Sequence, residues 1–305
     1  MGLSGTIPPY IGNLSSLALL SIKNNSFYGS LPDEVAHLRS LKTVDFGINF
    51  LTGEIPPWFW SLPELENLVL KGNHFLGTVP SSLSNTTTLK NIDLSYNQLS
   101  GSISSNLFNV SSLQIIDLSF NRLSGRLSVD MVLPELQELY LSGNQLYGQI
   151  SRSLFKCRQL EVLFLCSNNF TGAIPMELGN LTMLKELHLS HNNLEGTIPW
   201  EIGHLTIVKN LSISNNHLAG HIPSSIGNCT SLKEINFSVN NLTGALPPEI
   251  GNLSGLEVLR VNDNVLRGFI PSSVFNISTL QVVLLEMNFR EQFLVPSQMH
   301  RSSLS

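Results

Sequence analysis

The chain has 305 residues, a net charge of -5 at pH 7, 13% charged residues and 42% hydrophobic residues. This apolar share is enough for a substantial core, whereas the lack of any basic run excludes the electrostatic footprint of a protein that binds nucleic acid or an anionic membrane. No apolar run approaches the roughly 18 residues of a membrane helix, and the first residues lack the basic start and apolar centre of a signal peptide. We therefore expect a folded chain without nucleic-acid partners that does not itself insert into a membrane.

A repeat of 24 residues begins at Leu17 and keeps its register to Asn288, with one residue deleted in the fifth unit. Each unit opens with the pattern LxxLxLxxNxL and continues with xGxIPxxLxxLxx. The ninth position is asparagine in every unit: Asn25, Asn49, Asn73, Asn97, Asn121, Asn144, Asn168, Asn192, Asn216, Asn240, Asn264 and Asn288. Residues 1–16 match the second half of a repeat, residues 17–288 form the repeat domain, and residues 289–305 form an irregular tail.

The tripeptide Asp45-Phe46-Gly47 matches the magnesium-binding signature of protein kinases. It occupies positions five to seven of the second unit, and the 44 residues before it contain none of the glycine-rich loop, lysine or HRD loop that a kinase needs. The repeat therefore accounts for this tripeptide.

The first half of each unit predicts a short strand in which positions one, four and six are buried, while positions three, five, seven and eight face outward. One unit cannot bury its leucines alone, so neighbouring units are expected to stack around a continuous apolar core and to pair their strands in a parallel sheet. The pattern therefore predicts a solenoid.

The asparagine at position nine lies where the strand turns inward and leaves backbone groups without partners. An amide side chain both donates and accepts hydrogen bonds, so we expect a ladder in which each asparagine serves its own turn and the adjacent one. Cys157 and Cys229 stand where other units have leucine, so we expect small buried side chains. They lie three repeats apart, too far for a disulfide.

Ligand contacts are expected at the outward strand positions that the repeat leaves variable. Aromatic residues concentrate at positions five and eight of units four to eight, in a band suited to hot-spot contacts, and acidic residues beside them favour a ligand with basic groups. The candidate ligand-binding residues on the concave face are Asp93, Tyr96, Asp117, Phe120, Glu138, Tyr140, Phe164, Glu186, His188 and His191. The alternative is that these residues are tolerated fillers of the repeat.

Units four to six also replace the proline of the second half with Ser104, Ser128 and Ser151. Cys166, His188 and His191 project from neighbouring strands with Glu186 nearby, so a zinc site is conceivable, but exposed His and Cys need no metal and we expect none. No Ser/His/Asp arrangement, phosphate-binding loop or isolated acid pair stands out from the repeat. The sequence therefore predicts neither an enzyme nor a cofactor.

Twelve Asn-x-Ser/Thr sequons fit a secreted glycoprotein, although Asn-Leu-Ser/Thr is nearly part of the repeat, so their number partly restates it. They begin at Asn13, Asn24, Asn85, Asn109, Asn169, Asn180, Asn210, Asn228, Asn236, Asn241, Asn252 and Asn276. Asn210 and Asn236 fall on outward strand positions, where glycans would obstruct units nine and ten. This again favours the middle of the face as the binding region.

The unit LxxLxLxxNxLxGxIPxxLGNLxxL resembles the plant-specific class of leucine-rich repeat over nearly the whole chain. Stretches such as GAIPMELGNLTML (172–184) and GFIPSSVFNISTL (268–280) resemble the ectodomains of plant receptor-like serine/threonine kinases, in particular the immune-receptor branch with receptors for flagellin and elongation-factor peptides. The resemblance implies an α/β solenoid of about twelve repeats, a right-handed superhelix or horseshoe with a parallel sheet on its concave face. Such ectodomains also have cysteine-paired caps, a membrane helix and a kinase, so the resemblance implies a fragment or truncated product with a truncated end.

The same resemblance implies extracellular recognition of a peptide or protein ligand at the plasma membrane, in defence or developmental signalling, with a leucine-rich repeat co-receptor kinase as a further partner. The alternative is a free-standing secreted repeat protein that binds and inhibits a pathogen cell-wall hydrolase, as polygalacturonase inhibitors do.

Overall fold

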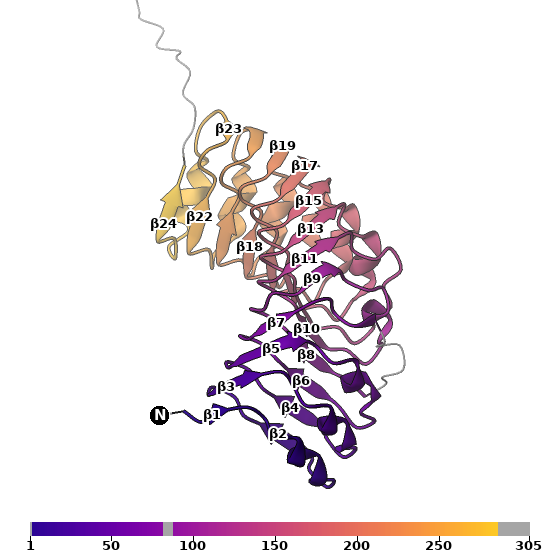
Figure 1. Cartoon of the computed structure of the whole chain (residues 1–305). Helices are drawn as coiled ribbons and strands as arrows, with labels where there is room; N and C mark the ends of the chain where they lie inside the picture. Colours follow the sequence, from indigo (N-terminus) through magenta and orange to yellow (C-terminus); the bar gives the residue numbers. More distant parts are fainter. Residues whose placement is uncertain (1, 82–87, 286–305) are drawn as a thin grey trace, which may run out of the picture.

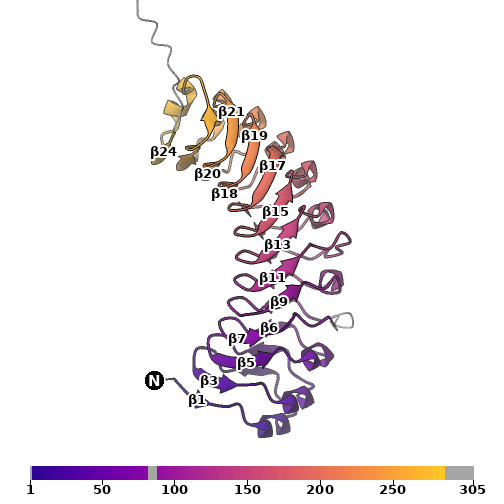
Figure 2. The same ribbon diagram turned by 45° about the horizontal axis from the view of Figure 1, so that its top comes forward.

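The computed structural model describes residues 2–81 and 88–285, which form a curved solenoid of stacked repeats (Figure 1). Along the chain, one row of strands builds a continuous sheet, a second row lines a flank, and short helical turns lie on the opposite side (Figure 2). The prediction of an α/β solenoid with an all-parallel sheet is confirmed. The described helical segments are all short 3-10 turns.

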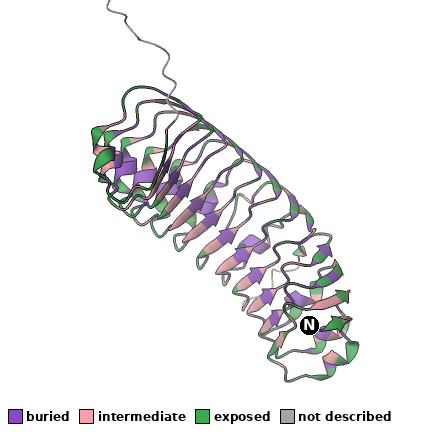
Figure 3. Ribbon diagram, turned by 90° about the vertical axis from the view of Figure 1, so that its left-hand side faces the viewer, coloured by how far each residue is buried: buried purple, intermediate pink, exposed green. Residues whose placement is uncertain are grey.

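The main sheet has 12 parallel strands in chain order. Its strands are β2 (Leu19–Ser21), β4 (Thr43–Asp45), β6 (Asn67–Val69), β8 (Asn91–Asp93), β10 (Ile115–Asp117), β12 (Glu138–Tyr140), β14 (Val162–Phe164), β16 (Glu186–His188), β18 (Asn210–Ser212), β20 (Glu234–Asn236), β22 (Val258–Arg260) and β24 (Val282–Leu284). Each strand spans positions three to five of its unit, and from β4 to β22 the middle residue is buried between two half-buried ones. Figure 3 shows the ribbon coloured by this burial. The predicted inward and outward alternation therefore holds across these strands.

The core lies behind this sheet and is filled by the leucines of the repeat. Leu41, Leu68 and Leu118 are completely buried, as are the phenylalanines Phe46 and Phe75 that replace leucine at other repeat positions. Burial of a side chain of this size contributes about 1.5–3 kcal/mol, and every unit adds several. Cys157 and Cys229 are buried in the same core, as expected. The pKa of the Cys157 thiol is raised to about 11 and that of Cys229 to about 12 by this burial.

The asparagines at position nine line the turn that follows each main-sheet strand. Asn97 is typical, since its Nδ2 donates to the carbonyls of Leu70, Leu94 and Ser95, and its Oδ1 accepts from the Phe75 amide at 3.0 Å. Each such side chain therefore joins its own turn to the preceding repeat. Ten of these side chains are buried: Asn49, Asn73, Asn97, Asn121, Asn144, Asn168, Asn192, Asn216, Asn240 and Asn264. Asn25 is half-buried, and Asn288 lies outside the described residues.

From Asn25 to Asn264, the residue before each ladder asparagine adopts a left-handed backbone conformation. Tyr96 has φ 53°, Phe120 has φ 54°, and the same position is Gly72 (φ 63°) and Gly143 (φ 67°) in the third and sixth units. This conformation reverses the chain so that the asparagine turns inward. Because left-handed φ costs roughly 1–2 kcal/mol for residues other than glycine, the ladder bonds must offset a strain repeated in almost every unit.

Position seven was expected to face outward, and this expectation is wrong for most units. Ser95, Ser119, Ser142, Ser190, Ser214 and Ser238 are all buried at this position. The strands end at position five, and the chain then bends toward the asparagine turn, which draws the next side chains away from solvent. Small side chains such as serine can therefore be buried at position seven. The longer side chain of Lys71 at the same position remains half-exposed.

The second row of strands was not predicted by the sequence analysis. It contains β1 (Ser4–Gly5), β3 (Ser26–Gly29), β5 (Phe50–Glu54), β7 (His74–Leu76), β9 (Ser100–Ser102), β11 (Arg122–Gly125), β13 (Gln145–Gly148), β15 (Asn169–Gly172), β17 (Asn193–Thr197), β19 (His217–Gly220), β21 (Asn241–Gly244) and β23 (Val265–Leu266). These strands follow the asparagine turn and end near the glycine that recurs in the second half of the unit. Gly125, with φ 88°, is an example. That positive φ favours glycine and turns the chain toward the convex side.

The convex side consists of the 3-10 turns η1 (Pro9–Asn13), η2 (Asp33–His37), η3 (Pro57–Ser61), η5 (Leu107–Asn109), η6 (Arg152–Lys156), η7 (Met176–Asn180), η8 (Trp200–His204), η9 (Ser224–Asn228), η10 (Pro248–Asn252) and η11 (Ser272–Asn276). A proline directly precedes most of these turns and sets their first φ. Some turns stack so closely that only glycine fits between them. A Cβ atom at Gly203 would lie 2.5 Å from the Ser225 carbonyl oxygen.

Candidate functional site

The candidate residues come from adjacent strands of the main sheet and from the turns that follow them. The register pairs Asp93 with Asp117, Asp117 with Tyr140, Tyr140 with Phe164, and Phe164 with His188. These five side chains therefore form one row across β8 to β16. All five are half-buried.

Tyr96 and Phe120 form the first aromatic cluster. Their rings stack with centroids 4.5 Å apart and an interplanar angle of 18°, and both side chains are exposed, at 59% and 48% respectively. Stacked aromatic pairs contribute about 0.5–1.5 kcal/mol beyond their buried area. The cluster therefore forms an ordered apolar surface at the end of the strands, open to a partner.

Tyr140, Phe164 and His188 form the second aromatic cluster. The Tyr140 and Phe164 centroids are 5.1 Å apart in an edge-to-face arrangement, and the Phe164 and His188 centroids are 4.3 Å apart. The sequence analysis expected one continuous aromatic band. Among the described residues, no ring contact joins the two clusters, because Gly143 and Ser167 follow Phe120 in the position-eight row and supply no ring.

Acidic side chains hold the second cluster in place from position three of the same strands. The Tyr140 hydroxyl donates to Glu138 Oε2 at 2.9 Å, and burial together with this acid raises the pKa of Tyr140. Glu186 accepts two hydrogen bonds from Asn210 Nδ2, at 2.9 and 2.8 Å, and lies 3.4 Å from His188 Nε2. His191 is exposed in the turn after β16 and makes no ring contact within the described part of the chain.

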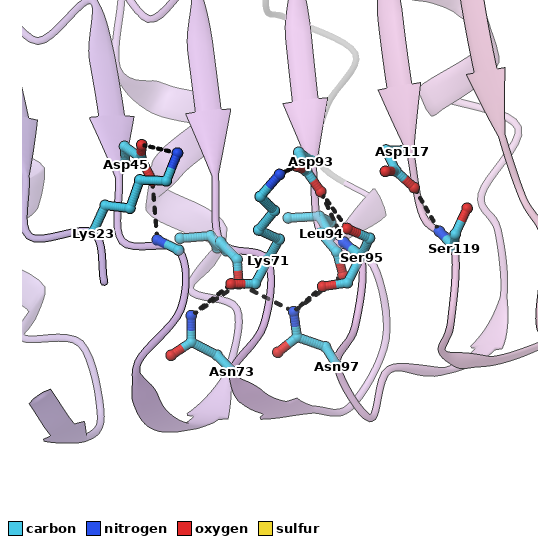
Figure 4. Close-up of polar contacts among 12 residues, drawn as sticks. Lys23, Asp45, Lys71, Asn73, Asp93, Leu94, Ser95, Asn97, Asp117 and Ser119 are labelled. Carbon is cyan, nitrogen blue, oxygen red and sulfur yellow. Dashed lines mark hydrogen bonds and ion pairs between the residues drawn. The ribbon is translucent and has the colours of Figure 1, made fainter. Parts of the chain in front are cut away.

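Aspartates at position five have a structural role in addition to their charge. Asp93 Oδ1 accepts the Ser95 amide at 3.1 Å, and Asp117 Oδ1 accepts the Ser119 amide at 2.9 Å (Figure 4). Asp45 binds the Gly47 amide in the same way. Each bond satisfies a backbone donor at the bend after the strand, so part of the acidic row is explained by the fold itself.

The charges of Asp93 and Asp117 differ in how they are compensated. Lys71 Nζ lies 3.1 Å from Asp93 Oδ2, and this carboxylate raises the pKa of Lys71 (Figure 4). Asp117 forms no ion pair within the described residues, and burial raises the pKa of its carboxyl, with a further contribution from the charge of Asp93. A carboxyl group without an ion pair in the described part of the chain therefore lies between the two aromatic clusters.

Within residues 2–81 and 88–285, no group of three His, Cys, Asp or Glu side chains is placed to hold a metal ion. Cys166 instead lies 3.1 Å from the Ser142 hydroxyl. No helix among the described residues is long and apolar enough to span a bilayer.

Nine sequon asparagines are exposed: Asn13, Asn24, Asn109, Asn169, Asn180, Asn228, Asn241, Asn252 and Asn276. Asn210 and Asn236 are half-buried on the main sheet, where Asn210 binds Glu186 and Asn236 accepts from Ser238. Asn85 lies outside the described residues. The exposed sequons are therefore on the turns and flanks, away from the candidate face.

Three residues with a part in the site were missed by the sequence analysis. Lys71 neutralises Asp93, Asn210 orients Glu186, and Gly143 lies under the Phe120 ring. The sequence could have predicted the ion pair of Lys71 with Asp93. Lys71 is at position seven of the third unit and Asp93 is at position five of the fourth, so the repeat places them on adjacent units. The other two depend on side-chain orientation, which the repeat pattern does not specify.

Comparison with known proteins places these observations in a family context. The leucine-rich repeat family models match residues 134–194, and also residues 40–62, 64–86, 88–110, 112–131, 208–229 and 231–253. The search of curated proteins finds no match.

Several solved structures are similar over most of this chain. The plant peptide hormone receptor RGFR1 in complex with RGF2 is 34% identical with a TM-score of 0.91, covering 93% of this chain and 46% of that one. PEPR1 with AtPEP1 is 31% identical with a TM-score of 0.82, covering 94% and 44%. The Arabidopsis receptor kinase HAESA in complex with the peptide hormone IDA and the co-receptor SERK1 is 28% identical with a TM-score of 0.61, covering 93% and 60%. The chain thus spans about half the length of the first two.

Proposed function

The chain belongs to the leucine-rich repeat family, and on that premise we propose that it is a ligand-recognition segment of a plant receptor-like kinase ectodomain. In this proposal the ligand is a peptide or a peptide-like segment of a protein, and it binds the concave face of units four to eight. In this proposal the chain acts as a binding surface.

One observation carries the proposal: an exposed and a half-buried aromatic cluster lie on the same face as Asp117, which has no ion pair among the described residues. Tyr96 and Phe120 form the first cluster, and Tyr140, Phe164 and His188 form the second. Exposed rings of this kind are typical of hot spots, because they bury a large area with little loss of side-chain entropy.

The acidic group indicates the charge of the ligand. Asp117 lacks an ion pair within the described residues, and desolvation raises its pKa. A basic side chain placed beside it would restore a favourable environment for the carboxylate. We therefore expect a ligand with a lysine or arginine near Asp117 and an aromatic or aliphatic residue on either cluster.

The similar structures support the same class of ligand. RGFR1 is described in complex with RGF2, and HAESA is described with a peptide hormone and a co-receptor. By analogy, a leucine-rich repeat co-receptor kinase is the proposed second partner, and the outer side of the plasma membrane is the proposed location. A role in defence or developmental signalling belongs to the same proposal.

The test is a selection of short random peptides against the full chain, repeated with Tyr140→Ala and Phe164→Ala. We expect the selected peptides to be enriched in basic and aromatic residues. Each of the two substitutions should weaken their binding, and so should added salt. Equal binding by all three proteins would remove the concave-face site. Binding to a cell-wall hydrolase, with no peptide selected, would replace the proposal with an inhibitor function.

A further inference from the structure

The fifth repeat differs from the others on the convex side. It is one residue short, and its residues 126–135 form no 3-10 turn, whereas the fourth and sixth units have η5 and η6 at this place. Without that turn, a hollow of about 620 Å³ opens between the ends of β11 and β13 and the start of η6. The hollow therefore lies where the shortened repeat has no 3-10 turn.

The floor of this hollow is closed by specific contacts. Ser153 Oγ accepts the Met131 amide at 3.3 Å and lies 2.8 Å from the Ser151 hydroxyl. Both serines are buried, and Met131 is buried as well, so the shortened segment still seals the core. The Val132 amide donates to the Phe108 carbonyl in the preceding unit at 2.9 Å. The hollow is thus a surface feature above an intact core.

Its charged lining is positive in a chain whose net charge is -5. Arg126 and Arg152 line it, and no acidic residue does. The Arg126 stem lies against Gly148, where a Cβ atom would be 3.1 Å from its Cγ. Arg126 forms no ion pair within the described residues, and Arg152 reaches Glu177 at 3.5 Å with its side chain 78% exposed. The Arg126 guanidinium is therefore available to a carboxylate.

Val129 supplies the exposed aliphatic surface of the hollow. Leu127, Val129 and Ile150 line it, and Val129 is 75% exposed, whereas Leu127 and Ile150 are buried. No aromatic ring is present in the lining, so the stacking surface that sugar rings commonly use is missing. Aliphatic contacts next to a guanidinium fit a peptide better than a carbohydrate.

We propose that this hollow, defined by Arg126, Val129, Gln149, Ile150 and Arg152, binds an extended acidic peptide segment of a partner protein. A glutamate or aspartate of the segment pairs with Arg126, and a neighbouring aliphatic residue packs on Val129. The site is separate from the concave face and goes beyond the function proposed for that face. A chain could therefore bind a ligand and this partner at the same time.

The test uses the full chain and a fluorescently labelled peptide with alternating glutamate and leucine, followed by fluorescence anisotropy. A matched peptide with glutamine in place of glutamate serves as the ligand control. We expect saturable binding of the acidic peptide only. Arg126→Gln should weaken it about tenfold, as loss of a charge-assisted bidentate contact does. Gln149→Trp, which fills the hollow, should abolish it.

Three controls decide between the outcomes. Arg122→Gln removes an exposed arginine at the start of β11, outside the hollow, and should leave binding unchanged. Phe164→Ala should also leave it unchanged, which separates this site from the concave face. Equal binding by wild type and Arg126→Gln, or no saturable binding, would overturn the proposal. Binding of an oligogalacturonate that depends on Arg126, in place of the peptide, would overturn it as well.

Discussion

Phe120 lies over Gly143, so closely that a Cβ atom at residue 143 would come 2.7 Å from the Phe120 Cδ1 atom. The ring of Phe120 in turn stacks on Tyr96. The first aromatic cluster therefore depends on a glycine one repeat further along, which also has the left-handed φ of 67° that other residues adopt only with strain.

Gly143→Ala should destabilise the chain by about 1–2 kcal/mol, because it adds a left-handed alanine and displaces the Phe120 ring. Urea unfolding measures the change. Gly255→Ala is the control, since a Cβ there meets only the Leu232 carbonyl oxygen at 3.8 Å and its φ is not positive. Equal losses in the two variants would show that Phe120 does not rest on Gly143.

Asn97→Ala tests the asparagine ladder. The substitution leaves buried backbone groups without partners, including the Phe75 amide, so we expect a loss of at least about 1–3 kcal/mol in the free energy of unfolding. Asn193→Ala, at an exposed position at the start of β17, should change it by less than about 0.5 kcal/mol. If Asn97→Ala changed the free energy of unfolding as little as Asn193→Ala, the ladder asparagines would not stabilise the fold.

Val239→Asn should stabilise the chain by up to about 1 kcal/mol, although it replaces an apolar residue with a polar one. Val239 is exposed and has φ 54°, a conformation that asparagine adopts far more readily than a β-branched residue. Val265→Asn makes the same chemical change in the strand β23, where the residue has no positive φ. This variant should destabilise the chain, because asparagine is less favourable than valine in a strand. Thermal unfolding of both variants checks the opposite signs.

The pKa of Asp117 gives a prediction for the dependence of stability on pH. Its pKa is raised in the folded state, so the folded chain binds this proton more tightly than the unfolded chain does. The carboxyl therefore reduces stability as pH rises from its unfolded pKa through its higher folded pKa, and the penalty persists above that range.

Asp117→Asn should accordingly raise the free energy of unfolding at pH 7 relative to wild type, and should have little effect at pH 3. The asparagine can keep the bond to the Ser119 amide, because Asn236 makes the same bond to Ser238. Asp130→Asn, at an exposed position, is the control. A variant that is less stable than wild type at pH 7 would contradict the sign.

The three thiols should differ in reactivity. Burial raises the pKa of Cys157 to about 11 and of Cys229 to about 12, whereas Cys166 is half-exposed on the concave side. A thiol reagent at pH 8 should modify one cysteine in the native chain and all three in denaturant. Rapid native modification of two or more would mean that the core is less closed than the structure indicates.

The sequence was sufficient for the parts of the fold that every repeat shares. Leucines at positions four and six and the asparagine at position nine specify the strand, the core and the turn, because each unit must bury the same groups in the same way. The second row of strands escaped prediction because its strands are only two to five residues long and contain many polar residues and glycines, such as Ser100 and Gly101 in β9. The burial of Ser95 at position seven depends on where the strand ends, which periodicity does not reveal.

The candidate face was predictable only as a set of positions. The row from Asp93 to His188 follows from register, so the sequence placed these side chains next to one another. Whether rings stack, and which acid finds a cation, depends on rotamers and on residues such as Gly143 and Lys71. For this reason the single aromatic band expected from the sequence is divided into two clusters.

The most direct test of the central claim is the dissociation constant of one selected peptide for wild type, Phe164→Ala and Leu76→Ala. Leu76 is an exposed apolar residue on β7, outside the main sheet. The account predicts that Phe164→Ala weakens binding by about tenfold or more, the loss expected of a hot-spot ring, and that Leu76→Ala has no effect. Unchanged affinity in Phe164→Ala, or an equal loss in both variants, would contradict recognition by the middle of the concave face.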